Sequence, residues 1–215
     1  MNKRTKLLLI GAGAHSHVVI DILLQNNDYE IVGCLDRSYL ADKNVQIYGV
    51  RVIGDDDKMQ EVFKSGVTKV HIALGENRLR NKLFDMAVNI GFEPITIVSR
   101  NAVISPRSTI GRGTVIMPGA VINVGTSIGD NCIINTNCSV DHDCIISKSC
   151  HIAPGCALSG NVTVGEGTHI GTGANIIDKV IIGEWSYIGA GALVVKDIEQ
   201  GILAYGVPAK KVRQL

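Results

Sequence analysis

The sequence has few aromatic residues, almost no excess of either charge and no long apolar run. Aromatic side chains make up 4% of the 215 residues, and 21 basic side chains face 20 acidic ones, for a formal net charge of +1. This balance, with no basic run, argues against binding nucleic acid or a membrane surface by bulk electrostatics. No apolar stretch is long enough to span a bilayer. What the chain does have is 24 glycines and many aliphatic residues, which is typical of strands joined by tight turns.

The N-terminal stretch MNKRTKLLLIGAGA imitates a signal peptide, with a basic start, an apolar run and small residues at its end. The apolar run is short, however, and an amphipathic helix pattern follows it at once. We therefore interpret Lys6 to Ile10 as a buried first strand that enters a glycine turn. With no bilayer-spanning stretch elsewhere, we expect a soluble protein of the cytoplasm.

From Ile97 to Ile198 the chain repeats every six residues without a gap. The second position of each hexad is Ile, Val or Leu, and the sixth is Ala, Ser, Thr or Cys in all but three hexads. Such a register over half a chain predicts a parallel β-helix, whose stacked coils bury one aliphatic column on each face. Glycine often follows the aliphatic residue, as at Gly111 and Gly129, where we expect a tight turn.

Five of the six cysteines could be read either as a metal cluster or as packing residues. They follow one another at intervals of six residues and all occupy the sixth, small position: Cys132, Cys138, Cys144, Cys150 and Cys156. A buried free cysteine behaves as a small apolar residue, and the chain has no CxxC pair. We interpret the five as packing residues with reduced thiols, and expect no metal site and no disulfide.

The phrase SVDHDC, which ends at Cys144, admits a zinc site, a catalytic base or a surface loop. His142 falls at the fourth hexad position, which should project outward, and acids flank it at Asp141 and Asp143. A single surface histidine is usually a bystander. Here the adjacent carboxylates would orient the imidazole and raise its basicity, which favours a general base.

The first half, residues 1–95, reads as strand, helix, strand, loop, strand, helix and strand, which predicts a small Rossmann-like parallel sheet. Its first turn, GAGAHS, lacks the third glycine of a dinucleotide-binding motif. Backbone N–H groups at Gly13, Ala14 and His15 are suited to a diphosphate, although His15 could equally be a plain helix-start residue. Asp36 ends the second strand, where it could hold a ribose or base.

A second group of polar residues follows the third strand, in the stretch GENRLR. Asn77 and Arg80 lie in it, at the same edge of the predicted sheet as the glycine turn. We expect both to face the ligand of that turn.

The stretch NTNCSVDHDC…CHIAPG, the Rossmann-like half before it and the terminal YGVPAK resemble the sialic acid O-acetyltransferase/UDP-amino-sugar N-acetyltransferase family of hexapeptide-repeat acyltransferases. The resemblance implies a nucleotide-sugar-binding domain over residues 1–95. It also implies a left-handed parallel β-helix with a C-terminal tail over residues 96–215, with three hexads in each coil. A homotrimer is implied as well, with acetyl-CoA between neighbouring β-helices.

The resemblance also implies roles for individual residues. His142 matches the general base, and Asp143 matches the acid that supports it, which is Glu in some relatives. Contacts to acetyl-CoA are implied for His151, Thr172 and Ala190. Asn135 is expected near the acceptor group. The segment from Gly206 to Lys210 is expected to close over the cofactor. In this family the first turn of the Rossmann-like half holds the nucleotide sugar.

These observations predict an acetyl-CoA-dependent N-acetyltransferase that acts on a UDP- or GDP-linked amino sugar for surface glycan synthesis. Transfer is expected to be direct, with His142 as the base. Two alternatives stay open. One is an O-acetyltransferase of sialic acid or a related sugar, and the other is a non-catalytic, trimeric nucleotide-binding scaffold.

Overall fold

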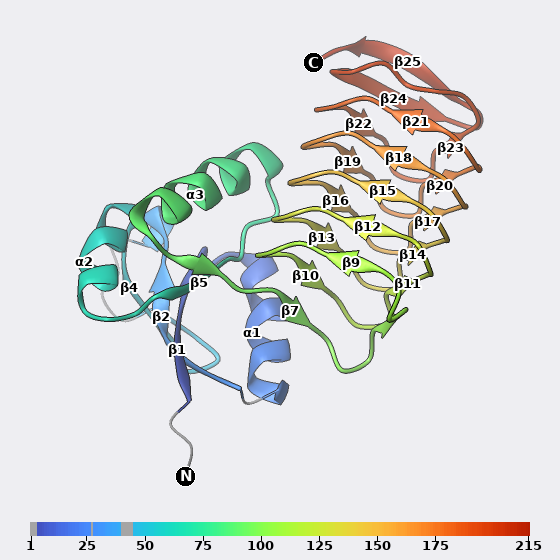
Figure 1. The fold of residues 1–215 in the computed structure, drawn as a ribbon. Coiled ribbons are helices and arrows are strands. Elements are labelled where there is room, and N and C mark those ends of the chain that lie inside the picture. Colours follow the sequence, from blue (N-terminus) through green and yellow to red (C-terminus); the bar gives the residue numbers. More distant parts are fainter. Residues whose placement is uncertain (1–3, 27, 40–44) are drawn as a thin grey trace. The chain divides into compact units, whose positions relative to one another are not determined.

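The computed structural model describes residues 4–26, 28–39 and 45–215, and the chain divides into two compact units, Met1–Ile97 and Val98–Leu215 (Figure 1). The first unit alternates strands and helices, whereas the second consists of short strands. Within the described ranges, no helix has both the length and the apolar character that crossing a membrane requires.

The first unit is a Rossmann-like sheet with helices, as the sequence predicts. Its elements are β1 (Thr5–Ile10), α1 (Ala14–Asn26), β2 (Tyr29–Leu35), η1 (Arg37–Tyr39), β3 (Gln46–Ile47), β4 (Val50–Gly54), η2 (Asp56–Lys58), α2 (Met59–Lys64), β5 (Lys69–Ile72), α3 (Asn77–Ile90) and β6 (Glu93–Pro94). The strand order is β3-β4-β2-β1-β5-β6, and all described pairs are parallel except the hairpin of β3 and β4.

The segment between β2 and β5, which the sequence predicts to be a loop, contains β3, β4, η2 and α2. These elements have two to six residues each, too few to give a periodic pattern. The chain then crosses from β4 to β5 on the other side of β1. In such sheets a ligand binds at the carboxyl ends of the strands where the order reverses, here those of β1 and β5.

The second unit is a left-handed parallel β-helix with three sheets, which we number by the first strand of each. The first sheet contains β7 (Ile97–Val98), β10 (Val115–Ile116), β13 (Ile133–Ile134), β16 (His151–Ile152), β19 (His169–Ile170), β22 (Tyr187–Ile188), β24 (Ile202–Gly206) and β25 (Ala209–Gln214). The second contains β8 (Val103–Ile104), β11 (Val121–Ile122), β14 (Ser139–Val140), β17 (Ala157–Leu158), β20 (Asn175–Ile176) and β23 (Leu193–Val194). The third contains β9 (Thr109–Ile110), β12 (Ser127–Ile128), β15 (Ile145–Ile146), β18 (Thr163–Val164) and β21 (Ile181–Ile182).

Each strand pairs with the strand one coil away, so that Ile116 pairs with Ile134 and Ile134 with Ile152. These second-position residues are fully buried and form the core of the unit. The stacking confirms the hexad register predicted from the sequence.

The prediction of tight turns at Gly111 and Gly129 is wrong, because the turns lie at another position of the hexad. The left-handed backbone lies at the fifth hexad position instead, for example at Asn131 (φ 59°) and Gly119 (φ 74°), whereas neither Gly111 nor Gly129 has a positive φ. A Cβ at Gly111 would lie 2.5 Å from the backbone nitrogen of Asp130. Glycine is therefore needed at this position for the close approach of the next coil.

Candidate active site

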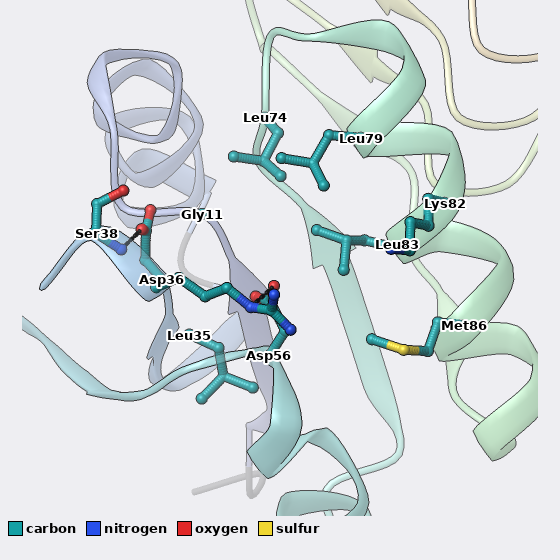
Figure 2. A pocket seen from close by; sticks show the side chains of 11 residues that line it. Gly11, Leu35, Asp36, Ser38, Asp56, Leu74, Leu79, Lys82, Leu83 and Met86 are labelled. Carbon is teal, nitrogen blue, oxygen red and sulfur yellow. Dashed lines mark hydrogen bonds and ion pairs between the residues drawn. The ribbon is translucent and has the colours of Figure 1, made fainter. Parts of the chain in front are cut away.

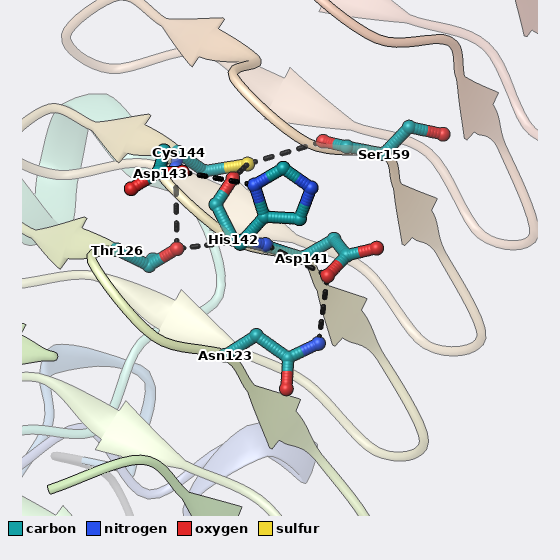
Figure 3. A network of polar contacts seen from close by, with 7 residues as sticks. All are labelled: Asn123, Thr126, Asp141, His142, Asp143, Cys144 and Ser159. Atoms are coloured by element: carbon teal, nitrogen blue, oxygen red, sulfur yellow. Dashed lines mark hydrogen bonds and ion pairs between the residues drawn. The ribbon is translucent and has the colours of Figure 1, made fainter. Parts of the chain in front are cut away.

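His142 and Asp143 form a hydrogen-bonded pair at the corner that follows β14 (Figure 3). Asp143 has left-handed backbone (φ 57°), a conformation that Asp tolerates better than most residues, and its Oδ2 lies 2.9 Å from His142 Nδ1. The imidazole is half exposed. With Nδ1–H donating to the carboxylate, Nε2 keeps its lone pair and can accept a proton.

The charges around the imidazole favour its basicity. The hydrogen bond to Asp143 is the main reason that the pKa of His142 lies above its usual range, and the charge of Asp141 adds to it. The Asp141 carboxylate accepts hydrogen bonds from Asn123 Nδ2 and from the His142 N–H, both at 2.8 Å, which hold the pKa of that carboxyl below its usual range. Asp141 therefore remains ionised and fixes the backbone that carries His142.

Two glycines of the neighbouring coils leave room for the two side chains of the pair. A Cβ at Gly125, one coil before Asp143, would lie 2.2 Å from Asp143 Oδ1. A Cβ at Gly160, one coil after His142, would lie 2.5 Å from both Cε1 and Nε2 of the imidazole. Neither glycine was predicted to belong to the site, although each stands one 18-residue coil from the residue it contacts, a spacing that the hexad register supplies.

Cys144 points into the core beside this pair. Its side chain is fully buried, and its Sγ donates to the carbonyl of Ser159 at 3.2 Å. Burial raises the pKa of the thiol, so it is a poor nucleophile. All five cysteines of the hexad column are buried, which confirms their inward position.

A second polar cluster lies on the first sheet and consists of Asn135 and His151. The Thr136 N–H donates to Asn135 Oδ1 at 2.8 Å, which turns the amide nitrogen toward His151 Nε2 at 3.0 Å. His151 Nε2 is therefore the acceptor, and Nδ1 carries the hydrogen. His169 lies against His151 edge to face, with ring centroids 4.7 Å apart, and stacks on Tyr187 at 4.4 Å.

Thr172 and Ala190 lie one coil apart at the corner that follows the strands of the first sheet. Both are exposed, and the Thr172 carbonyl accepts from the Gly191 N–H at 2.8 Å. His142 lies at a different corner, the one that follows the second sheet. One chain thus places the expected acetyl-CoA contacts and the expected base at two different corners of the β-helix.

In the first unit, Asp36 holds the glycine turn between β1 and α1. Its Oδ2 accepts from the Ala12 N–H at 2.7 Å and its Oδ1 from the Ser38 N–H at 2.8 Å. Gly13 follows in this turn, and a Cβ added there would have no neighbour within 4 Å. The turn that the sequence assigns to a diphosphate therefore has open space above its second glycine and leads into α1 at Ala14.

The other three predicted acceptor residues of this unit are largely buried. Burial, together with His71 and Arg80, lowers the pKa of His15 to about 3, so that the imidazole is neutral at pH 7. Arg80 is 1% exposed, and its Nη1 donates to the carbonyls of Leu74 and Gly75. It thereby fixes the loop after β5, and Asn77 begins α3 beside it. Direct contact of these residues with an acceptor stays a prediction.

Two family models match the chain. Residues 6–87 match the PglD N-terminal domain, and residues 161–196 match six repeats of the bacterial transferase hexapeptide. None of the curated proteins compared with the chain matches it in sequence.

Solved structures match the chain over almost its full length. PerB, the perosamine N-acetyltransferase of Caulobacter crescentus, in complex with CoA and GDP-perosamine, is 38% identical, with 97% of each chain covered and a TM-score of 0.92. The acetyltransferase domain of PglB from Neisseria gonorrhoeae, in complex with acetyl coenzyme A, is 34% identical over 98% of this chain and 100% of that one, with a TM-score of 0.90. The chain belongs to the amino-sugar N-acetyltransferases of the hexapeptide-repeat acyltransferase family.

As a member of this family, the protein is a sugar N-acetyltransferase. The fold is also shared with WeeI from Acinetobacter baumannii, which is 24% identical over 97% of this chain and 100% of that one, with a TM-score of 0.83. In this chain, the described geometry gives a half-exposed imidazole with a hydrogen-bonded carboxylate, namely His142 with Asp143, at a corner of the β-helix.

Proposed function

We propose that the protein transfers the acetyl group of acetyl-CoA to the amino group of a UDP- or GDP-linked amino-deoxy sugar for surface glycan synthesis. The observation that carries the proposal is the exposed His142–Asp143 pair, with Nε2 free to accept a proton. The likeness to PerB, which binds CoA and GDP-perosamine, and to the PglB domain, which binds acetyl coenzyme A, supports the donor and the acceptor class. The reduced, buried cysteines suit a cytoplasmic enzyme.

His142 acts as the general base in this proposal. Its Nε2 accepts a proton from the amine while the amine nitrogen forms a bond to the thioester carbonyl carbon. The carbon–sulfur bond then breaks, and the protonated imidazole returns the proton to the departing thiolate. Asp143 stabilises the imidazolium between these two steps. Cys144 is buried and faces the core, which supports direct transfer without an acyl-enzyme.

The proposed enzyme is a homotrimer whose sites lie between neighbouring β-helices. The exposed corner with Thr172 and Ala190, and His151 beside it, would bind acetyl-CoA. The hairpin of β24 and β25 adds exposed cationic side chains at Lys210 and Lys211 that suit its phosphates. His142 lies at another corner of the same chain. A second copy that brings its own His142 to this corner would complete the site.

The acceptor part of the proposal rests on the first unit. The N–H groups of Gly13, Ala14 and His15 open α1, and a helix N-terminus favours a diphosphate. A free monosaccharide has no phosphate group that this turn could bind. Binding energy from the nucleotide would be used to place the amine at Nε2 of His142.

The test is the release of free thiol from acetyl-CoA with four acceptors: a GDP-linked amino sugar, a UDP-linked one, the free amino sugar and sialic acid. We expect kcat/KM for one nucleotide-linked amine to exceed that for the free sugar by more than about a hundredfold. Equal use of the free sugar contradicts the nucleotide-linked acceptor, and faster acetylation of sialic acid contradicts N-transfer. No thiol release with any of the four contradicts an enzyme of this class.

Gly13→Ala tests the turn itself, because its Cβ enters open space without disturbing a neighbour. We expect a rise in KM for the nucleotide-linked sugar of about tenfold, an unchanged rate with the free sugar and an unchanged Tm.

A further inference from the structure

A cavity of about 220 Å³ lies in the first unit, at the carboxyl ends of β1 and β2 (Figure 2). One side of it is mostly apolar, with Lys82 beside the apolar residues of α3, and the other carries most of the charged side chains together with Leu35. The lining residues are Gly11, Leu35, Asp36, Arg37, Ser38, Asp56, Leu74, Leu79, Lys82, Leu83 and Met86. Because Gly11 begins the turn that is suited to the diphosphate, the cavity lies beside that turn, where the nucleoside end of a nucleotide sugar would be held.

The apolar side of the cavity comes largely from one face of α3. Leu79, Leu83 and Met86 recur at helical spacing and, in Figure 2, stand opposite Asp36 and Asp56. A surface of this kind packs against the flat face of an aromatic ring. Such a surface offers no hydrogen bonds to the hydroxyl groups of a sugar or to a phosphate, so the cavity suits a nucleobase.

The charged side contains a carboxylate that is almost withdrawn from solvent. The Asp56 side chain is 10% exposed and has one ion pair, from Arg37 Nε to its Oδ2 at 3.1 Å. Burial, and the charges of Asp36, Asp55 and Asp57, raise the pKa of its carboxyl against the opposing effect of Arg37. A buried carboxylate in such surroundings is stabilised by a ligand that brings N–H donors.

The four nucleobases differ in the donors they can offer to a carboxylate. Guanine presents two adjacent donors on its Watson–Crick edge, N1–H and the 2-amino group, which match the two oxygens of a carboxylate. Uracil has one N–H between two carbonyls, and adenine and cytosine each place an acceptor beside their amino group. These acceptors would repel a carboxylate. Guanine also needs a donor for O6, and Arg37 and Lys82 both line the cavity.

We propose that this cavity binds guanine, with the Asp56 carboxylate accepting hydrogen bonds from N1–H and the 2-amino group, so that the acceptor is a GDP-linked amino sugar. The inference rests on the proposed function, because it names the nucleotide of that acceptor. Asp56 is thus the residue that determines specificity for the base, while Asp36 holds the turn for the diphosphate.

The experiment measures nucleotide affinity by titration calorimetry on the full chain, with GDP, IDP, UDP, ADP, CDP and XDP. We expect wild type to bind GDP more than about tenfold tighter than UDP, ADP or CDP. IDP lacks the 2-amino group and should bind about tenfold more weakly than GDP, because one of the two hydrogen bonds is lost. Tighter binding of UDP than GDP, or equal binding of IDP and GDP, overturns the inference.

Asp56→Asn should change the preferred base from guanine to xanthine, which a purely structural role of Asp56 does not predict. The Asn amide donates where the 2-amino group of guanine also donates, so GDP binding should fall about a hundredfold. Xanthine carries a carbonyl at that position, so the variant should prefer XDP to GDP. Asp57→Asn is the matched control: Asp57 also pairs with Arg37 but does not line the cavity, and this variant should keep the preference for GDP.

If Asp56→Asn loses affinity for GDP and gains none for XDP, the recognition of guanine by Asp56 is overturned. If the variant does not fold, the comparison of IDP with GDP on wild type decides the question. A chain that binds none of the six nucleotides, yet acetylates a free amino sugar, contradicts the nucleotide-linked acceptor of the proposed function rather than the choice of base.

Discussion

The imidazole of His142 lies against the Cα of Gly160 in the next coil of the β-helix, where a Cβ would come within 2.5 Å of its Cε1 and Nε2 atoms. Atoms cannot remain at that distance, so any other residue at position 160 must displace the ring or the coil. The backbone of Gly160 does not have a positive φ, so its conformation does not require glycine. Glycine is needed at position 160 because a larger residue would displace the imidazole of His142.

Gly160→Ala should therefore reduce catalysis more than stability. A displacement of the imidazole by a fraction of an ångström is expected to lower kcat at least about tenfold, because proton transfer depends on the position of Nε2. Gly66→Ala is the control, since Gly66 has a positive φ (94°) and no neighbour near its added Cβ. It should lower Tm and keep kcat. Steady-state kinetics and thermal unfolding of both variants make the comparison, and a wild-type kcat in Gly160→Ala contradicts the role of the contact.

The pH dependence of kcat should report the pair of His142 and Asp143. The neutral imidazole is the active form of a base, so kcat rises with pH through the pKa of His142, which Asp143 raises. Asp143→Asn removes the charge, and the acid limb of the profile should move to lower pH with a lower plateau, because the base is weaker. Measurement of kcat between about pH 5 and 8 tests this. A limb that stays at the wild-type pH would show that Asp143 does not tune the base.

Two threonines make the same hydrogen bonds at different distances from His142. Thr126 Oγ1 accepts from the Cys144 N–H and donates to the Asp141 carbonyl at 2.6 Å, whereas Thr114 Oγ1 accepts from the Cys132 N–H and donates to the Gly129 carbonyl. Thr→Val at either position leaves a buried N–H without its acceptor and should cost about 1–3 kcal/mol of unfolding free energy.

Only Thr126→Val should also lower kcat, since Asp141 directly precedes His142. Chemical denaturation and steady-state kinetics of the two variants test the pair. An equal loss of kcat in both would show that the solenoid as a whole, and not the local strand, positions the base.

The sequence predicted the solenoid well because one physical rule acts at every coil. An aliphatic residue in each second position is needed to fill the core, so the register of Ile116, Ile134 and Ile152 can be recognised from the amino-acid sequence alone. The outward position of His142 followed from the same register. The expected turn at Gly111 failed, since hexad spacing does not tell a glycine that turns from one that allows a neighbouring coil to approach.

The contact of Gly160 with His142 and the cavity of the first unit were missed for a different reason. Gly160 and His142 are both unremarkable until the coil length places one over the other. Asp56 lies in a short helical turn within a segment predicted to be a loop, and it lines a cavity together with residues of α3 that are distant in the sequence. Neither feature leaves a local pattern in the sequence, and of the two only the glycine contact can be found from the 18-residue coil length.

If the protein forms the trimer proposed above, the position of His142 and Thr172 at two different corners of one chain makes a prediction about mixed trimers. His142→Ala should lower kcat by about two to four decades as a homotrimer. Thr172→Trp places a large side chain at the exposed donor corner and should abolish acetyl-CoA binding while its own His142 stays intact. If each site takes His142 from one copy and Thr172 from the next, every mixed trimer has one complete site out of three and should show about a third of wild-type activity. A site built within one chain would regain none, because every chain in the mixture carries one defect. Co-expression with two affinity tags, purification of the mixed trimers and measurement of thiol release distinguish these outcomes, and homotrimers of each variant provide the baseline.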